Sequence, residues 1–219
     1  MLSHPHKTLF VHIPKCGGQS VETAFLNDLG LDWGTRSPLL LRRNGNPRLG
    51  PPRLAHLKAN EYVKYHYASS EMFDSYYKFA VLRDPIDRMV STFNYMGLKS
   101  EDGELLQWDA FLYQWLPRKI QSSNFFVAPQ REYICDTDGS VLVDDVFWLE
   151  NLSDAFETIK RRSNLESDLP HVNSSEKRMK RADLSQKDSD FISDLYSGDL
   201  DFIEDLGLRA SGKPTRVEA

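Results

Sequence analysis

The sequence predicts an α/β fold, in which a mainly parallel sheet is flanked by helices in three layers. Residues 8–13, TLFVHI, are a short apolar run rich in β-formers, followed by a Pro-Lys-Cys-Gly-Gly turn and a helix-spaced apolar pattern. The stretch KFAVLRDPIDRMVSTFNYM repeats this order from Lys78. Two strand–turn–helix units favour parallel strands, and 219 residues, 40% of them hydrophobic, suit one domain with a buried core.

Each unit has its own boundary signals. In the first, Val21, Ala24, Phe25 and Leu29 share one helical face, and Gly30 can end the helix. In the second, Phe79 to Leu82 is the strand, Asp84 is a suitable N-cap and Pro85 suits the first helical position. Its apolar stripe is Ile86, Met89, Val90 and Phe93.

The rest of the chain predicts a single domain over 1–212. Further elements are expected as helices near 108–116, 152–162 and 186–197, the last with a capping box from Ser185 to Asp188, and as a strand from Val141 to Val143. The tail, 213–219, is expected to be disordered.

Composition and charge exclude several classes of protein. The net charge of −5 argues against a general nucleic-acid-binding surface. No apolar run reaches about 18 residues, so no transmembrane segment is expected. The first strand leaves no room for a signal peptide before it, which favours a cytoplasmic location. Two cysteines make no disulfide framework.

Basic residues are concentrated between Asp32 and Glu61, where no acidic residue occurs. They are Arg36, Arg42, Arg43, Arg48, Arg53 and Lys58. Pro47, Gly50 and the following prolines indicate a loop. Two interpretations stay open, a solvated basic loop and a flap over an anionic ligand.

The first turn has the features of a phosphate-binding loop. Gly17 and Gly18 permit close backbone approach, helix N-terminal N–H groups bind anions, and Lys15, Gln19 and Ser20 add a cation and polar groups. It is not the G-x-x-x-x-G-K-[ST] loop, nor G-x-G-x-x-G. A C-x-x-x-x-x-R phosphatase loop from Cys16 is excluded because position 22 is Glu22.

The second turn places Arg83 at a strand end and Ser91 two helical turns later. Arginine binds phosphate in a bidentate manner, and ligands of parallel sheets gather at the carboxyl ends of the strands. Two anion sites on adjacent strand ends predict a ligand with two separated anionic groups.

These residues carry a family likeness. FVHIPKCGGQSV resembles the 5′-phosphosulfate loop of sulfotransferases, in the branch that reads H-I-P-K-T-G-G-T-S and includes carbohydrate sulfotransferases. FAVLRDPIDRMVSTFNY resembles the family's 3′-phosphate segment, R-[DN]-P-x-[DE]-R-x-x-S-x-[YF]. Softer similarity continues through AHLKANEY, DGSVLVDDVFWLENL, LPHVNSS and LYSGDLDFIEDLGL, in the expected order. The resemblance implies a P-loop-like fold.

The resemblance also implies a donor and the roles of its ligands. The donor is 3′-phosphoadenosine 5′-phosphosulfate (PAPS), the product is the 3′,5′-bisphosphate (PAP), and no metal is required. Lys15 would be catalytic, at the oxygen that bridges phosphate and sulfuryl group. The 5′-phosphate would be bound by Lys15, Cys16, Gly17, Gly18, Gln19 and Ser20, and the 3′-phosphate by Arg83 and Ser91. Cys16 and Gln19 depart from the family pattern.

Transfer to a hydroxyl needs a base, and the resemblance favours His56 in Ala-His-Leu-Lys. His12 is its main rival, and the carboxylates of Glu61 and Asp87 stay open. A late loop with His171, Asn173, Ser174, Lys177 and Arg178 is expected to close over the nucleotide, or else to be an exposed polar loop.

The expected partner is a hydroxyl acceptor, a carbohydrate or glycolipid, and no nucleic acid. The sequence does not predict the oligomeric state. Two other functions stay open. One is a kinase or NTPase, disfavoured by the position of the lysine, and the other is a non-catalytic nucleotide-binding module.

Overall fold

A five-stranded sheet organises the computed structural model, which describes residues 1–99, 102–170, 178–208 and 215–216. The strands are β1 (Leu2–Ser3), β2 (Thr8–Val11), β3 (Tyr77–Leu82), β4 (Asp145–Trp148) and β5 (Thr215–Arg216), in that spatial order. β3 pairs in parallel with β2 and with β4, while the two outer pairings are antiparallel. The α/β fold with a mainly parallel centre is therefore confirmed.

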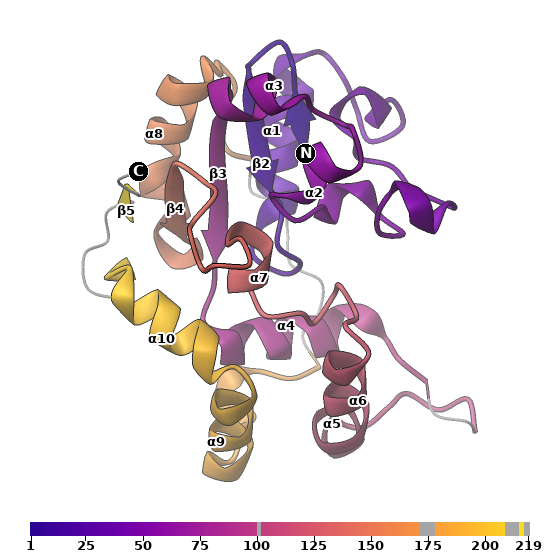
Figure 1. Ribbon diagram of the computed structural model, residues 1–219. Coiled ribbons are helices and arrows are strands. Elements are labelled where there is room, and N and C mark those ends of the chain that lie inside the picture. Colours follow the sequence, from indigo (N-terminus) through magenta and orange to yellow (C-terminus); the bar gives the residue numbers. More distant parts are fainter. Residues whose placement is uncertain (100–101, 171–177, 209–214, 217–219) are drawn as a thin grey trace.

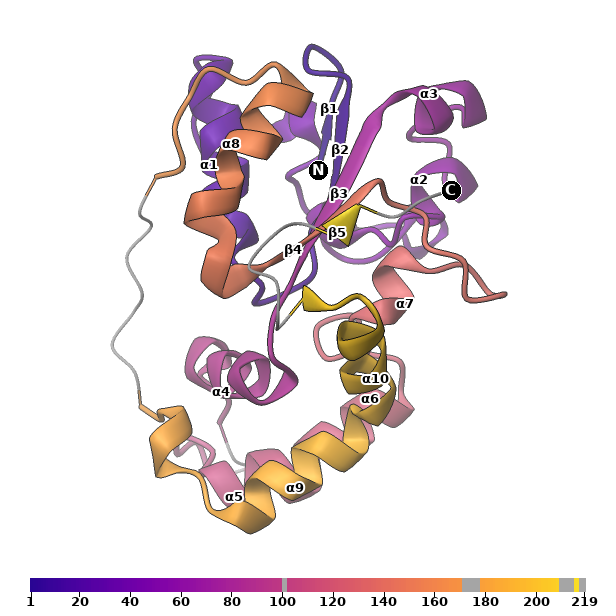
Figure 2. The same ribbon diagram turned by 90° about the vertical axis from the view of Figure 1, so that its left-hand side faces the viewer.

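Side chains alternate between the two faces of this sheet. Phe10, Phe79 and Phe147 lie in one buried cluster together with residues of α1 (Gly18–Asp28) and α8 (Leu152–Ser163). Leu9, Ala80 and Val146 point to the opposite cluster, which is covered by α2 (Glu61–Lys64), α3 (Ser70–Ser75) and α7 (Arg131–Ile134). Figure 2 shows the sheet between these two layers of helices. The three predicted layers follow from this period-two alternation.

A further group of helices lies beyond the carboxyl ends of the central strands (Figure 1). It comprises α4 (Pro85–Met96), α5 (Trp108–Ala110), a π-helical stretch (Phe111–Trp115), α6 (Leu116–Gln121), α9 (Gln186–Leu195) and α10 (Ser197–Asp205). Met89 and Phe93 of α4 pack there with Phe111 and Ile192. Short 3₁₀ helices cover Ser37–Leu39, Pro47–Leu49, Leu54–His56, Leu149–Asn151 and Arg181–Asp183. Among the described residues no helix is long and apolar enough to cross a membrane.

Most predicted elements are found, and one strand is misplaced. Ser185 and Asp188 form the expected capping box of α9. The strand predicted at 141–143 is wrong, because Val141 makes only an isolated bridge to Cys135 and β4 begins at Asp145. A charged residue is not expected in a buried strand, so the sequence did not predict β4 at Asp145. The Asp145 carboxylate is nevertheless buried and accepts hydrogen bonds from Tyr77 Oη at 2.8 Å and Arg162 Nη1 at 2.6 Å.

The tail shows one paired segment. Thr215–Arg216, within the part expected to be disordered, form β5 against β4. Residues 209–214 and 217–219 lie outside the described part of the chain. The single domain over 1–212 stays a prediction.

Arg88 is a fully buried arginine on α4. Its guanidinium donates to three backbone carbonyl oxygens, those of Pro14 at 3.1 Å, Ala128 at 2.9 Å and Phe126 at 3.2 Å. It therefore fastens the first turn and the 126–128 segment to α4.

We expect Arg88→Met to lower the free energy of unfolding by roughly 3 kcal/mol, because it leaves buried carbonyl oxygens without donors. Urea unfolding followed by circular dichroism measures this. Arg161→Met, at an exposed position of α8, is the control. Equal stability of both variants would contradict a structural role for Arg88.

Candidate functional site

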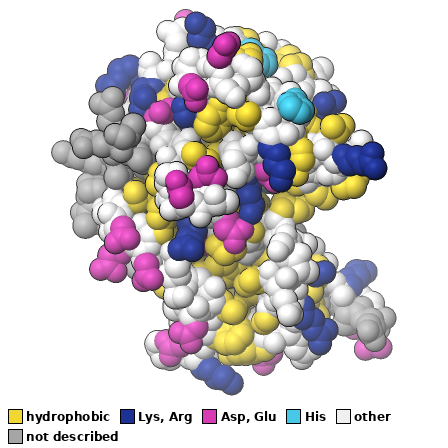
Figure 3. All heavy atoms as spheres, viewed as in Figure 1, with side chains coloured by type: hydrophobic (Ala, Val, Ile, Leu, Met, Phe, Trp, Pro, Cys, Tyr) yellow, Lys and Arg dark blue, Asp and Glu magenta, His cyan; other side chains and the backbone are white. Residues whose placement is uncertain are grey.

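A cavity of about 1000 Å³ lies at the carboxyl ends of β2 and β3, between the sheet and α4. Both predicted turns line it, through Lys15, Gly17, Gly18, Gln19 and Ser20 from the first, and Arg83 and Ser91 from the second. Figure 3 shows the surface notched between the part that contains the sheet and the lower helices, with Lys and Arg side chains on both sides.

The first turn presents backbone N–H groups to this cavity. Gly17 precedes α1 with φ of 75°, and no side chain caps the helix. A Cβ on Gly17 would lie 2.4 Å from Leu149 Cδ1, and one on Gly18 would lie 2.2 Å from His12 Nε2. Gly17 is therefore required by the positive φ of the turn, and Gly18 by its close packing against the His12 ring. The uncapped first turn carries the positive end of the helix dipole, which favours an anion there.

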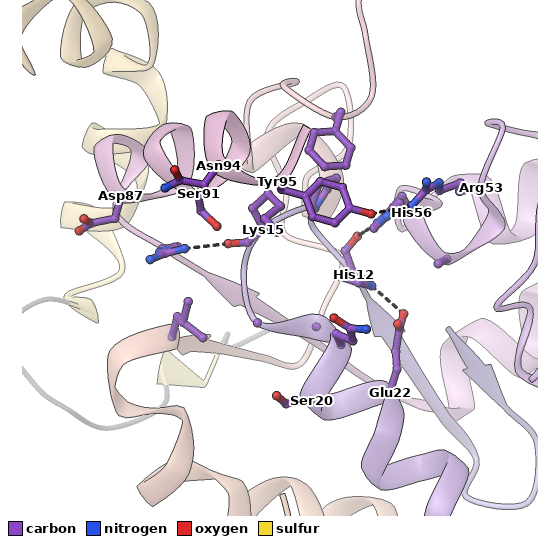
Figure 4. Close-up of a pocket in the computed structure, with 18 of the residues that line it drawn as sticks. His12, Lys15, Ser20, Glu22, Arg53, His56, Asp87, Ser91, Asn94 and Tyr95 are labelled. Carbon is purple, nitrogen blue, oxygen red and sulfur yellow. Dashed lines mark hydrogen bonds and ion pairs between the residues drawn. The ribbon is translucent and has the colours of Figure 1, made fainter. Parts of the chain in front are cut away.

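Lys15 extends from this turn toward α4 (Figure 4). Its Nζ lies 4.0 Å from the ring centroid of Tyr95, in a cation–π contact. Burial, with a smaller effect of the Arg83 charge, lowers the pKa of Lys15 to about 8. The ammonium is thus held where an added negative charge would stabilise it.

Cys16 does not join the other residues of the turn. Its side chain is 1% exposed, and Sγ donates to Gln130 Oε1 at 3.3 Å, away from the cavity lining. Its N–H donates to Ile13 O at 3.3 Å. The expectation that Cys16 contacts the ligand is not supported by this geometry. Burial raises the pKa of the Cys16 thiol to about 12, which disfavours the thiolate at neutral pH.

Gln130 connects the two turns, a role that the sequence did not reveal. Its amide pairs with both backbone groups of Arg83, at 3.0 Å to N and 2.8 Å to O, while its Oε1 also accepts the Cys16 thiol. Arg83 Nη1 donates to Lys15 O at 3.3 Å. Arg83 Nε is buried and has no partner among the described residues. An anion in the cavity would supply the missing acceptor.

Two histidines meet beside the first turn. His56 Nδ1 lies 2.9 Å from His12 O, and because a carbonyl only accepts, Nδ1 carries the proton and Nε2 keeps its lone pair. Burial, followed by the His12 charge, lowers the pKa of His56 well below its ordinary value. His12 Nδ1 lies 2.6 Å from the Glu22 carboxylate. All three residues line the cavity.

The two carboxylates considered as bases are placed differently. Asp87 lines the cavity, but its Oδ2 accepts from Arg181 Nη1 at 2.6 Å. Glu61 is outside the cavity lining and accepts the N–H of Lys58. Of the four candidates, the two histidines therefore suit the role of base best. His56 lines the cavity and keeps the lone pair on Nε2, and His12 lines the cavity with its Nδ1 against the Glu22 carboxylate.

The cavity is strongly basic in a chain of net charge −5. Among the described residues, eight cationic side chains line it, against the carboxylates of Glu22 and Asp87: Lys15, Arg36, Arg42, Arg43, Arg53, Arg83, Lys180 and Arg181. Four of them come from the basic segment between Asp32 and Glu61, so this segment forms part of the cavity wall. Arg48 does not line it, and Lys58 pairs with Glu132 at 2.6 Å.

The late loop is placed only in part. His171, Asn173, Ser174 and Lys177 lie outside the described residues. Arg178 points elsewhere, since it donates to Leu106 O at 3.0 Å and packs over Phe93. Lys180 and Arg181, which the sequence did not single out, line the cavity instead. Tyr95 and Asn94 were also missed, although their spacing from Ser91 and Asp87 on α4 forms a polar helical stripe.

An uncapped helix N-terminus at the carboxyl ends of parallel strands, facing a basic cavity, is an arrangement suited to a phosphorylated ligand. The family is shown by sequence comparison. Residues 1–206 match the family model described as the sulfotransferase family, and the chain belongs to that family. It is therefore a transferase that moves a sulfuryl group to a hydroxyl acceptor. Comparisons with curated proteins and with solved structures gave no significant match.

Proposed function

We propose that this protein transfers a sulfuryl group from PAPS to a hydroxyl of a carbohydrate or glycolipid. The observation that carries the proposal is the meeting of the two predicted anion-binding turns in one cavity, which eight cationic side chains of the described residues line. PAPS has anionic groups at its two ends, which suits two sites held side by side by Gln130. Membership of the sulfotransferase family supports the reaction class.

The chain's own groups account for donor binding. The N–H groups at Gly17, Gly18 and Gln19, with the Ser20 hydroxyl, would bind the 5′-phosphate. Arg83 and Ser91 would bind the 3′-phosphate, with the unpaired Arg83 Nε as a further donor. Cys16 would contribute only to the packing beneath the turn. Among the described residues, no three His, Cys, Asp or Glu side chains form a metal-binding group.

The same groups suit direct transfer. Bound PAPS supplies an activated sulfuryl group. Lys15 would neutralise the charge that develops on the oxygen of the leaving phosphate. His56, with Nε2 unprotonated, would accept the proton of the acceptor hydroxyl as its oxygen bonds to sulfur and the bond from sulfur to the bridging oxygen breaks. His12 stays its rival. The cytoplasmic location expected from the sequence stays a prediction.

The first test concerns donor binding. We expect Arg83→Ala to weaken PAP binding about 10- to 100-fold, as the loss of a charge-assisted contact of about 1.5–3 kcal/mol predicts. Isothermal titration calorimetry measures this. Arg48→Ala is the matched control, because it also removes one arginine, at a position that is exposed and outside the cavity lining.

The outcomes separate the proposal from its alternatives. Unchanged PAP affinity in Arg83→Ala would refute the assigned 3′-phosphate site. Magnesium-dependent ATP turnover by the wild type would favour a kinase or NTPase. Tight PAP binding without transfer from PAPS to any glycan of a broad panel would favour a non-catalytic module.

A further inference from the structure

Asp199 is a buried carboxylate on α10, 1% exposed and outside the cavity lining. Its Oδ2 accepts the N–H of Gln130 at 2.7 Å, and its Oδ1 accepts the N–H of Arg131 at 3.0 Å. Helix α10 therefore holds the start of α7, and the two helices lie side by side (Figures 1 and 2). A buried carboxylate destabilises the fold unless hydrogen bonds compensate it, so these two contacts are needed in the folded protein.

Gln130 passes this constraint to the second turn. Its side chain is 0% exposed, its Oε1 accepts the N–H of Arg83 at 3.0 Å, and its Nε2 donates to Arg83 O at 2.8 Å. The two hydrogen bonds hold both backbone groups of Arg83, as a neighbouring strand would. Arg83 Nη1 in turn donates to Lys15 O at 3.3 Å. A continuous chain of hydrogen bonds thus runs from α10 through Gln130 to both turns.

The segment that contains Gln130 is also tied directly to the first turn. Cys16 Sγ donates to Gln130 Oε1 at 3.3 Å. Arg88 donates to Pro14 O at 3.1 Å and to Ala128 O at 2.9 Å. This segment therefore contacts the first turn at two positions and the second turn at one.

The sheet alone does not set the spacing of the two turns. The pairing of β2 with β3 ends at Val11 and Ala80, before either turn begins. Contacts outside the ladder must therefore hold the turns at a fixed separation. Gln130 supplies such contacts, because its Oε1 accepts from Cys16 and from Arg83 at once.

A ligand with phosphates at both ends gains from a fixed spacing. When its first phosphate is bound, the second is already placed at its own site, so the second contact costs little further entropy. A ligand with a single phosphate gains nothing from the spacing, because it occupies one turn only.

We infer that Gln130 and Asp199 are positioning residues that set the separation of the two turns, and thereby make the site selective for a nucleotide phosphorylated at both ends. This rests on the proposed function, because PAPS and PAP are such nucleotides. It goes further by naming two residues that do not line the cavity and yet determine which nucleotide is bound.

The test compares PAP with adenosine 5′-phosphate and adenosine 3′-phosphate, each of which carries one of its phosphate groups. Isothermal titration calorimetry of the full chain measures the three dissociation constants. We expect Gln130→Met, which removes the amide from a side chain of similar length, to weaken PAP binding at least about tenfold. Binding of each monophosphate should change less than about threefold, because each turn keeps its own donors. Gln107→Met is the matched control, at an exposed glutamine outside the cavity lining.

A more conservative variant tests the same inference at α10, and carries the test if Gln130→Met does not fold. Asp199→Asn keeps the shape of the side chain but replaces one acceptor oxygen by a donor, so one of the two backbone N–H groups loses its partner. We expect PAP binding to weaken about three- to tenfold and monophosphate binding to stay within about twofold. Asp201→Asn is the control, at an exposed position of the same helix.

Failure of the wild type to bind PAP would refute the proposed function itself. If the wild type binds PAP, the inference is overturned when both variants keep the PAP affinity of the wild type. It is also overturned when the loss of PAP affinity equals the combined losses for the two monophosphates, since the two residues would then support each turn separately.

Discussion

Lys15→Ala is expected to lower kcat at least about 10³-fold while PAP affinity falls less than tenfold. The reason is that Lys15 would act on charge that exists only as the bond to the leaving phosphate breaks, and removing one such preorganised donor costs about 10²–10³ in rate. The partly desolvated position against the Tyr95 ring strengthens the effect, because the ammonium acts at a lower local dielectric constant. Transfer from isotope-labelled PAPS, read by mass spectrometry, measures kcat once an acceptor is found.

A second cationic residue of the same cavity provides the control. Lys180→Ala removes an equal charge from the cavity lining. If both variants lose the same activity, the effect is one of general electrostatics, and the specific role of Lys15 is contradicted. The thermal unfolding midpoint of each variant shows whether the fold persists.

His56→Ala is expected to lower kcat about 10²- to 10³-fold with little change in PAP affinity, as the loss of a general base predicts. His12→Ala separates the two histidines. It removes the ring but keeps the backbone carbonyl that orients His56, so the Nδ1–H tautomer is preserved. If His12→Ala abolishes transfer and His56→Ala does not, the assignment of the base is wrong.

The pH dependence of kcat/KM follows from the same two residues. Burial lowers the pKa of His56 well below its ordinary value, so the base is unprotonated at neutral pH, and the acid limb lies at lower pH than an ordinary histidine would give. Lys15 must be protonated, and its pKa of about 8 in the free protein places the alkaline limb near pH 8. Activity therefore rises from acid pH, stays level near neutrality and falls as pH passes 8. A profile still rising above pH 9 would contradict the role of the ammonium.

Local patterns predicted most of the fold and both turns. The apolar runs of β2 and β3 and the caps of α4 and α9 depend on residues close together in the chain, so the sequence predicted them. β4 was misplaced because the Asp145 carboxylate accepts hydrogen bonds from Tyr77 and Arg162, which lie 68 and 17 residues away in the sequence. From sequence alone a charged residue is predicted to be exposed, because its buried partners are not known.

The sequence predicted those residues of the candidate site that belong to continuous segments of the chain. Arg83 and Lys15 were found because their turns are continuous segments. Gln130 and Tyr95 act across 47 and 80 residues of sequence, and no local pattern points to such contacts. The orientation of Cys16 could not be predicted either, since it depends on the buried Gln130 amide, whose Oε1 accepts a hydrogen bond from the thiol.

The close approach of His12 to Gly18 has a consequence for how this chain can evolve. An alanine at position 18 would place its methyl group within the His12 ring, at 2.1 Å from Cδ2. The two positions are therefore expected to change together: in a library that randomises both, larger residues at 18 should survive only with a smaller residue at 12. Glu22 would then lose its partner and become free to vary. The loop thus carries a three-residue covariation constraint that is independent of any ligand.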